Sequence, residues 1–258
     1  KFRITQDINS EVTDDSDAFE IEGKITFNAP LESGLLWTVG ATNKVISWTP
    51  TGTFDTVNIY YSKDGGAFTN EIKTGISNSG SGVRKDWTWT TPGVPNDLND
   101  QVKIRVVAGN DPNVYATTPN NIKFVGSLDV TAPESAERIV WYVDETNKQI
   151  SWDSNGTVTN VDIYYRTTYT GSAKEIVLKN GGHTSGGNAY AWTAPVPDEK
   201  SETCYIKVAD HAHPTDVFSI TDEAKPFSIR PVINVTVPAL GQNIEVNSTN
   251  NTVTWNCN

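Results

Sequence analysis

Asp210, His211 and His213 form the most metal-like group in the sequence, which reads DHAH at this point. Side chains two residues apart on a strand lie on the same side, so the two imidazoles could share a transition metal. A matching segment about 102 residues earlier reads AGND and has neither histidine. Because one copy of the segment works without these side chains, we predict a polar loop here.

Asp14, Asp15 and Asp17 offer carboxylate oxygens, which are the ligands that Ca²⁺ prefers. The sequence around them has no D-x-D-x-D-G loop, and the corresponding segment of the next repeat, near residues 117–120, carries almost no charge. We expect no bound metal or other cofactor, and Ca²⁺ at this cluster is the lesser alternative. A melting temperature that does not respond to a chelator would remove it.

Catalytic groups are hard to assemble from this chain. His183 is the only other histidine, and it lies in a glycine-rich segment. No serine or cysteine has the G-x-S-x-G setting of an activated nucleophile, and no pair of carboxylates recurs between the repeats. We therefore predict that the protein is not an enzyme and has no catalytic residues.

Four Asn-x-Ser/Thr sequons mark candidate glycosylation sites, at Asn155, Asn234, Asn247 and Asn250. The two cysteines are Cys204 and Cys257. Cys204 falls where an immunoglobulin domain often carries its second cysteine, but the strand expected to face it has none. A bond between the two would cross a domain boundary, and we expect them not to pair.

The net charge of −11 excludes several classes of partner. A surface this acidic repels a phosphate backbone and anionic lipid head groups, so we expect no nucleic-acid partner. No window approaches the eighteen apolar residues of a membrane-spanning helix. With 36% hydrophobic and 10% aromatic residues the chain should fold, and 258 residues are enough for about two domains.

An internal repeat organises the sequence. The segment WTVGATNKVISW (37–48) returns as WYVDETNKQISW (141–152) and again as EVNSTNNTVTW (245–255), a step of about 103 residues. The segments VNIYY and WTWTTP keep the same register as VDIYY and YAWTAP. Many landmarks in one register do not arise by chance.

The repeat register predicts four segments. Residues 1–28 are the C-terminal strands of one repeat, 29–131 and 132–236 are complete repeats, and 237–258 are the N-terminal strands of another. The sequence is thus expected to begin and end within domains of a longer array. The two partial ends together lack everything equivalent to VNIYY and WTWTTP, so they are not expected to complete a domain between neighbouring molecules.

Each repeat has the pattern of an all-β, immunoglobulin-like sandwich. Apolar and polar residues alternate in short segments rich in Val, Ile, Thr and aromatics, and Gly-Asn-Asp turns separate them. About seven strands in about 103 residues is the size of such a domain. A tryptophan that recurs at a strand position in each repeat more often packs in the core than serves as an exposed platform for a sugar. We therefore assign to the core Trp48, Trp89, Trp152, Trp192 and Trp255. Solvent exposure of Trp37 and Trp141 would favour the sugar-binding alternative.

A family resemblance follows from the segments LESGLLWTVGATNKVISW (31–48), VNIYYSKDGG (57–66), DWTWTTP (86–92) and VKIRVV (102–107). Together they resemble the Kre9/Knh1-like domain, also called the Ser-Thr-rich GPI-anchored membrane family. The resemblance implies a module of fungal wall proteins or of very large bacterial or archaeal surface proteins. It supplies no catalytic residues, and this chain lacks the Ser/Thr-rich stalk of the fungal members.

The predicted function is a structural repeat segment of an extracellular, cell-surface protein, such as a surface layer, sheath, filament or giant-adhesin shaft. Its expected partners are neighbouring repeats and copies of itself. The alternative is an adhesion module that binds glycans or proteins through loops at one end of a sandwich, around residues 75–85 and 180–188.

Overall fold

The computed structural model describes residues 1–135, 137–249 and 251–257. The described residues form twenty-two strands and no helix, in two compact units. The first unit contains residues 1–36, 41–93 and 99–123, and the second contains 37–40, 94–98 and 124–258. No helix in the described part of the chain is long and apolar enough to cross a membrane.

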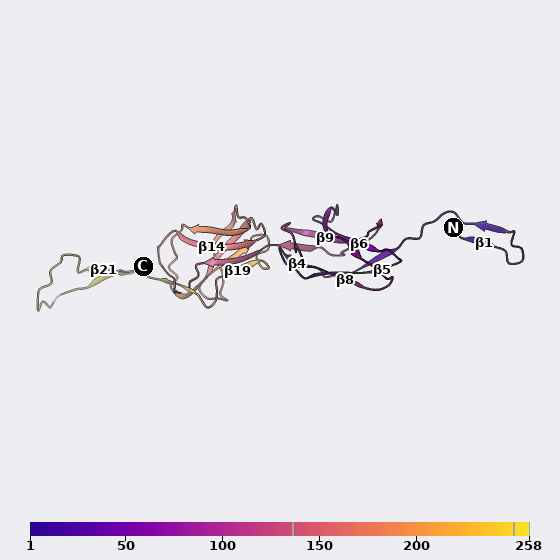
Figure 1. The fold of residues 1–258 in the computed structure, drawn as a ribbon. Helices are drawn as coiled ribbons and strands as arrows, with labels where there is room; N and C mark the ends of the chain where they lie inside the picture. Colours follow the sequence, from indigo (N-terminus) through magenta and orange to yellow (C-terminus); the bar gives the residue numbers. More distant parts are fainter. Residues whose placement is uncertain (136, 250, 258) are drawn as a thin grey trace. The chain divides into compact units, whose positions relative to one another are not determined.

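The first sandwich consists of two sheets (Figure 1). Its smaller sheet has the order β3-β5-β8, with β3 (Lys24–Ala29), β5 (Lys44–Thr51) and β8 (Lys85–Trp89). Its larger sheet has the order β4-β11-β9-β6-β7, and β10 pairs with β9. The bounds of these strands are β4 (Leu35–Thr38), β6 (Thr56–Ser62), β7 (Asn70–Ser77), β9 (Asn99–Ala108), β10 (Asp111–Thr117) and β11 (Ile122–Val125).

The second sandwich repeats this arrangement strand for strand. Its smaller sheet has the order β12-β14-β17, with β12 (Ser127–Ala132), β14 (Lys148–Asn155) and β17 (Gly186–Trp192). Its larger sheet has the order β13-β20-β18-β15-β16, and β19 pairs with β18. The bounds are β13 (Val140–Tyr142), β15 (Asn160–Arg166), β16 (Lys174–Gly181), β18 (Ser201–Asp210), β19 (Phe218–Ile220) and β20 (Phe227–Arg230). The predicted fold class, tandem immunoglobulin-like β-sandwiches, is confirmed.

The strand that opens each sandwich lies before the boundary expected from the sequence. β3 pairs antiparallel with β5, and Phe27 lies opposite Trp48. β12 pairs with β14 in the same way, and Val130 lies opposite Trp152. The segments before Pro30 and Pro133, which resemble linkers in sequence, therefore belong to the sandwich that follows them.

Buried side chains from both sheets fill each sandwich. In the first, the most buried include Trp48 and Ile46 of the smaller sheet and Ile59, Ile104 and Phe124 of the larger one, all at most 1% exposed. In the second sandwich the rings of Tyr165 and Trp192 lie 5.6 Å apart across the two sheets, and those of Trp141 and Trp192 lie 5.9 Å apart. Burying each such aromatic side chain stabilises the fold by about 2–3 kcal/mol.

The tryptophans outside the expected core list are also buried. Trp37 is 3% exposed and Trp141 is 5% exposed. A ring with so little exposed surface cannot serve as a platform for a sugar. The sugar-binding alternative for these two positions is therefore excluded by their burial.

The Thr-Asn pair that recurs in each repeat lies in a turn whose backbone adopts the left-handed conformation, with positive φ. Gly40, Asp144 and Asn247 occupy equivalent positions with φ of 73°, 68° and 66°, and Asn43 and Asn147 follow with φ of 63° and 60°. Glycine, asparagine and aspartate adopt this conformation more easily than other residues. The turn chemistry thus limits which residues the repeat can carry here.

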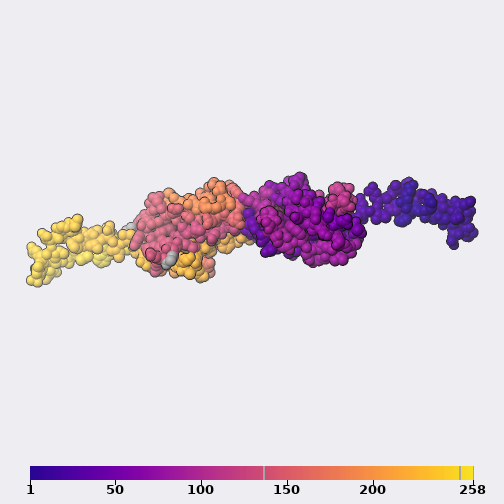
Figure 2. Space-filling model, in the orientation of Figure 1, coloured from indigo at the N-terminus to yellow at the C-terminus, as the bar shows by residue number. Residues whose placement is uncertain are grey.

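A two-stranded ribbon lies at each end of the chain, β1 (Arg3–Thr5) with β2 (Thr13–Asp15) and β21 (Ile233–Val237) with β22 (Thr254–Cys257). Figure 2 shows each as a slender segment, indigo and yellow, and each forms a sheet of two strands. Trp255 lies opposite Val235, as Trp152 lies opposite Val130, but it is 59% exposed. Trp255 is therefore not in a core among the described residues, and its assignment to the core of a following repeat stays a prediction.

Candidate functional site

The structure separates the metal-like residues of the second sandwich into two pairs. His213 Nδ1 lies 2.9 Å from Asp210 Oδ2, and His211 Nδ1 lies 2.8 Å from Oδ1 of Asp162. Asp162 is buried and also accepts a hydrogen bond from the backbone N–H of Lys179 at 2.8 Å. Each carboxylate therefore orients one imidazole, that of His211 exposed and that of His213 half-buried. The described residues contain no group of three metal-ligating side chains.

The acidic residues of the first ribbon are exposed. Asp15 accepts hydrogen bonds from Arg3 Nε at 2.7 Å and from Arg3 Nη2 at 3.1 Å. The Arg3 guanidinium holds the pKa of Asp15 below its usual range. Asp14 and Asp17 lie on the same exposed segment. One of the three carboxylates is thus already occupied by an arginine.

The modification candidates differ in accessibility. Asn155, Asn234 and Asn247 are exposed, and Asn250 lies outside the described residues. Cys204 and Cys257 are not joined in a disulfide, and the first is buried while the second is exposed. Burial raises the pKa of the Cys204 thiol, which disfavours the reactive thiolate.

Asn78, which the sequence analysis did not single out, anchors one of the two glycine-rich loops to the core. Its Oδ1 accepts a hydrogen bond from Trp48 Nε1 at 2.7 Å, and its Nδ2 donates to the carbonyl of Phe54 at 3.2 Å. Only 2% of Asn78 is exposed. The repeat register, which aligns this loop with the one around His183, was the available signal.

His183 takes the place of Asn78 in the second sandwich. Its backbone N–H bonds to the carbonyl of Thr159, as that of Asn78 bonds to Asp55. The His183 ring packs edge-on against Trp152, with centroids 4.8 Å apart. Trp152 Nε1 has no hydrogen-bond acceptor among the described residues. The buried indole N–H of Trp152 therefore lacks the kind of acceptor that Asn78 gives to the equivalent N–H of Trp48 in the first sandwich.

We expect the second sandwich to lose stability in mild acid because of His183. Burial is the largest cause lowering the pKa of His183 below its ordinary value of 6.5, and Trp152, Asn180 and Asn188 around it are uncharged. Between the lowered folded pKa and about 6.5 the unfolded chain binds the proton first, so the free energy of unfolding falls as pH falls.

Amide hydrogen exchange, followed separately for the first and the second sandwich from pH 8 to pH 5, measures this change in the free energy of unfolding. All three histidines of the chain lie in the second sandwich, so the first is an internal control. The His183→Asn variant should lose this part of the pH dependence. Unchanged pH dependence in that variant would contradict the prediction.

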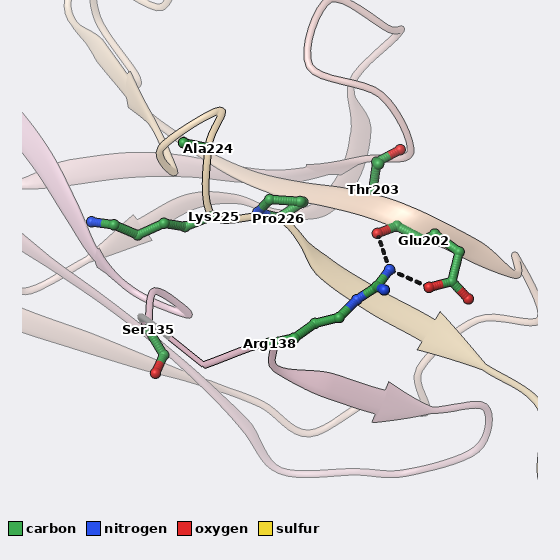
Figure 3. Close-up of a pocket in the computed structure, with 7 residues that line it drawn as sticks. All are labelled: Ser135, Arg138, Glu202, Thr203, Ala224, Lys225 and Pro226. Atoms are coloured by element: carbon green, nitrogen blue, oxygen red, sulfur yellow. Dashed lines mark hydrogen bonds and ion pairs between the residues drawn. The ribbon is translucent and has the colours of Figure 1, made fainter.

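A pocket opens on the surface of the second sandwich (Figure 3). It has a volume of about 370 Å³ and is lined by Ser135, Arg138, Glu202, Thr203, Ala224, Lys225 and Pro226. These residues come from the segment before β13, from β18 and from the segment before β20. Figure 3 shows Arg138 reaching across to Glu202, while Lys225 extends the other way.

Arg138 is held in place by three contacts. Its Nε donates to Ser228 Oγ at 3.0 Å, and its Nη2 donates to the backbone carbonyl of Glu202 at 2.8 Å and to the Glu202 carboxylate. Arg230 Nη2 donates to the same carboxylate at 3.0 Å. The two guanidinium groups lower the pKa of Glu202. The hydrogen bond from Arg230 is the largest cause, and the positive charges of Arg138 and Arg230 add to it. Glu202 is therefore ionised and satisfied at neutral pH.

The other cation of the pocket is Lys225. Its Nζ lies 3.3 Å from a carboxylate oxygen of Asp222 and 3.7 Å from one of Glu134. These neighbours, Asp222 first, raise the pKa of Lys225, so the ammonium stays charged. The lining has no histidine or cysteine, and its cations Arg138 and Lys225 are paired with carboxylates of the same sandwich.

Among the comparisons with known proteins, only the search of solved structures finds matches. No family model matches the chain, and no curated protein matches it. A structure of titin immunoglobulin tandem domains is 10% identical, with 81% of this chain and 99% of that chain covered and a TM-score of 0.32. Titin domains Z1Z2 in complex with telethonin are 14% identical, with 82% and 97% covered and a TM-score of 0.24. At these TM-scores the fold assignment rests on the strand order and register described above.

Proposed function

We propose that this chain is a structural repeat segment of an extracellular surface protein, such as a surface layer, sheath, filament or adhesin shaft. The observation that carries the proposal is the recurrence of one strand order and one buried core in both sandwiches, while their exposed polar residues differ. A repeated domain that preserves its packing and varies its surface serves as a building unit.

The parallel pairing of the second strand with the last strand of the second sandwich supports a load-bearing role. β13 pairs parallel with β20, with Trp141 opposite Ile229. Backbone hydrogen bonds of 2.9 Å run from Ser228 N to Ile139 O and from Val143 N to Arg230 O. When parallel strands near the two ends of a domain are pulled apart lengthwise, their hydrogen bonds are loaded together. Such a domain resists extension better than one that opens bond by bond.

The resemblance to the Ser-Thr-rich GPI-anchored membrane family supports the extracellular location. The acidic surface, with a net charge of −11, and the four sequons suit a glycosylated protein outside the cell. Neighbouring repeats and copies of the same chain are the partners that this role implies.

Electron microscopy of source cells, labelled with antibodies raised against the 258-residue chain, tests the proposal. We expect label on the cell surface, along filaments or over a regular lattice. Label confined to the cell interior, or surface label on isolated globules, would overturn it. The rival function, adhesion through the loops near 75–85 and 180–188, predicts instead that a glycan array detects binding that loop substitutions remove.

A further inference from the structure

Strand β17 forms an open edge of the smaller sheet in the second sandwich. It pairs with β14 along all of its seven residues, Gly186–Trp192, and no other strand in the described part of the chain pairs with it. In an antiparallel ladder alternate residues point their backbone N–H and C=O groups away from the partner strand. The free side of β17 therefore carries a row of hydrogen-bonding groups that a further strand can use.

Natural edge strands are protected against such pairing by charged side chains or by bulges. The other edge strands of five or more residues in the two sandwiches are β3, β7, β8, β10, β12 and β16, and each contains a charged residue. All of them except β8 also have a register shift in their ladder. Among these described edge strands, β17 is the one with neither a charged residue nor a register shift.

The first sandwich protects the same edge with an ion pair. Asp86 of β8 lies opposite Ser47, as Ala189 of β17 lies opposite Ser151. Two residues earlier Arg84 stands where the second sandwich has Gly187, and Arg84 Nε donates to Asp86 Oδ1 at 2.9 Å. The second sandwich thus has small, uncharged residues where the first has exposed charges.

We propose that the free edge of β17 pairs antiparallel with the β17 edge of a second copy of this chain. A two-fold axis relates the two strands, so Ala189 lies opposite Ala189 of the other copy and Gly187 lies opposite Ala191. These three residues are exposed and small, so their side chains do not obstruct the approach.

Charge favours a second copy as the occupant of this edge. The chain has a net charge of −11, so contact between copies through most of the surface brings like charges together. Residues 186–192 contain no charged side chain, and an identical edge matches them in length and in neutrality. The inference rests on the proposed structural role and names the strand through which copies associate.

Sedimentation velocity of the 258-residue chain, with reductant present because Cys257 is exposed, tests the proposal. A single edge contact buries little surface, so we expect a reversible dimer with a Kd on the order of 0.1–1 mM. Amide hydrogen exchange within Gly186–Trp192 should slow as the dimer fraction rises, because the new ladder bonds protect N–H groups of this strand.

A charged substitution and a matched control locate the contact. Ala189→Lys should weaken dimerisation about tenfold or more, because it places two ammonium groups opposite each other at the two-fold axis. Ala189 is exposed, and unchanged exchange of the second sandwich at low protein concentration verifies that the variant folds. Thr88→Lys adds the same charge to the exposed face of β8 and should leave dimerisation unchanged.

Three results would each overturn the proposal. They are a chain that stays monomeric at about 1 mM, slower exchange confined to the ribbon of β21 and β22, and equal dimerisation of Ala189→Lys and the parent chain. None of them changes where antibody label lies on source cells, so a failure here is distinguishable from a failure of the structural function.

Discussion

Trp152→Ala is expected to destabilise the second sandwich by about 3–5 kcal/mol, which is a large part of the stability of a typical domain. The indole is fully buried between the two sheets, and alanine would leave a cavity that rigid strands cannot collapse into. Because the chain has two sandwiches, a single transition does not describe its unfolding. Urea titration with hydrogen exchange resolved by domain measures the effect.

Trp255→Ala is the matched control for this substitution. Trp255 occupies the same repeat position and pairs with Val235 as Trp152 pairs with Val130, but it is 59% exposed. Its replacement should change the stability of either sandwich by less than about 0.5 kcal/mol. Equal losses in the two variants would mean that burial in the second sandwich is not what makes Trp152 important.

Asn78→Ala is expected to cost the first sandwich about 2–4 kcal/mol. The substitution leaves the buried Trp48 N–H without its acceptor at 2.7 Å and the Phe54 carbonyl without its donor at 3.2 Å. Each buried polar group left unpaired costs about 1–3 kcal/mol. Thermal unfolding of the variant, with the second sandwich as internal reference, gives the number.

A reciprocal exchange separates the hydrogen bond from the packing of the loop. His183→Asn should stabilise the second sandwich by about 1 kcal/mol, because it supplies the acceptor that Trp152 Nε1 lacks among the described residues. Asn78→His should destabilise the first sandwich for the converse reason. A His183→Asn variant less stable than the wild type would show that the imidazole packs better on Trp152 than an amide bonds to it.

The fold followed from the sequence because its signal is repeated and local. Alternating strands such as VNIYY and VDIYY, and the turn at Asn43 and Asn147, depend on backbone geometry within a few residues. The opening strands were misplaced because Phe27 and Val130 join a sheet through partners about twenty residues away. A pairing over that distance leaves no periodicity at the boundary itself.

The candidate sites were less accessible to sequence reasoning. DHAH predicted a polar loop, and the structure adds that His211 pairs with Asp162, a residue on a different strand. The pocket went unnoticed because Arg138 and Glu202 are far apart in the chain and each resembles an ordinary surface charge. Only the small length differences between repeats pointed toward it.

The sequence by itself determined the β-sandwich class, the repeat step and the tryptophans available for a core, because these depend on residue type and spacing. Tertiary structure alone decided which tryptophans are buried. Within the described residues Trp152 lies beneath a second sheet, whereas Trp255 lies in a two-stranded ribbon and is 59% exposed. It also decided which residues far apart in the chain line one pocket, since the position of a side chain depends on the partners that its strand finds across the fold.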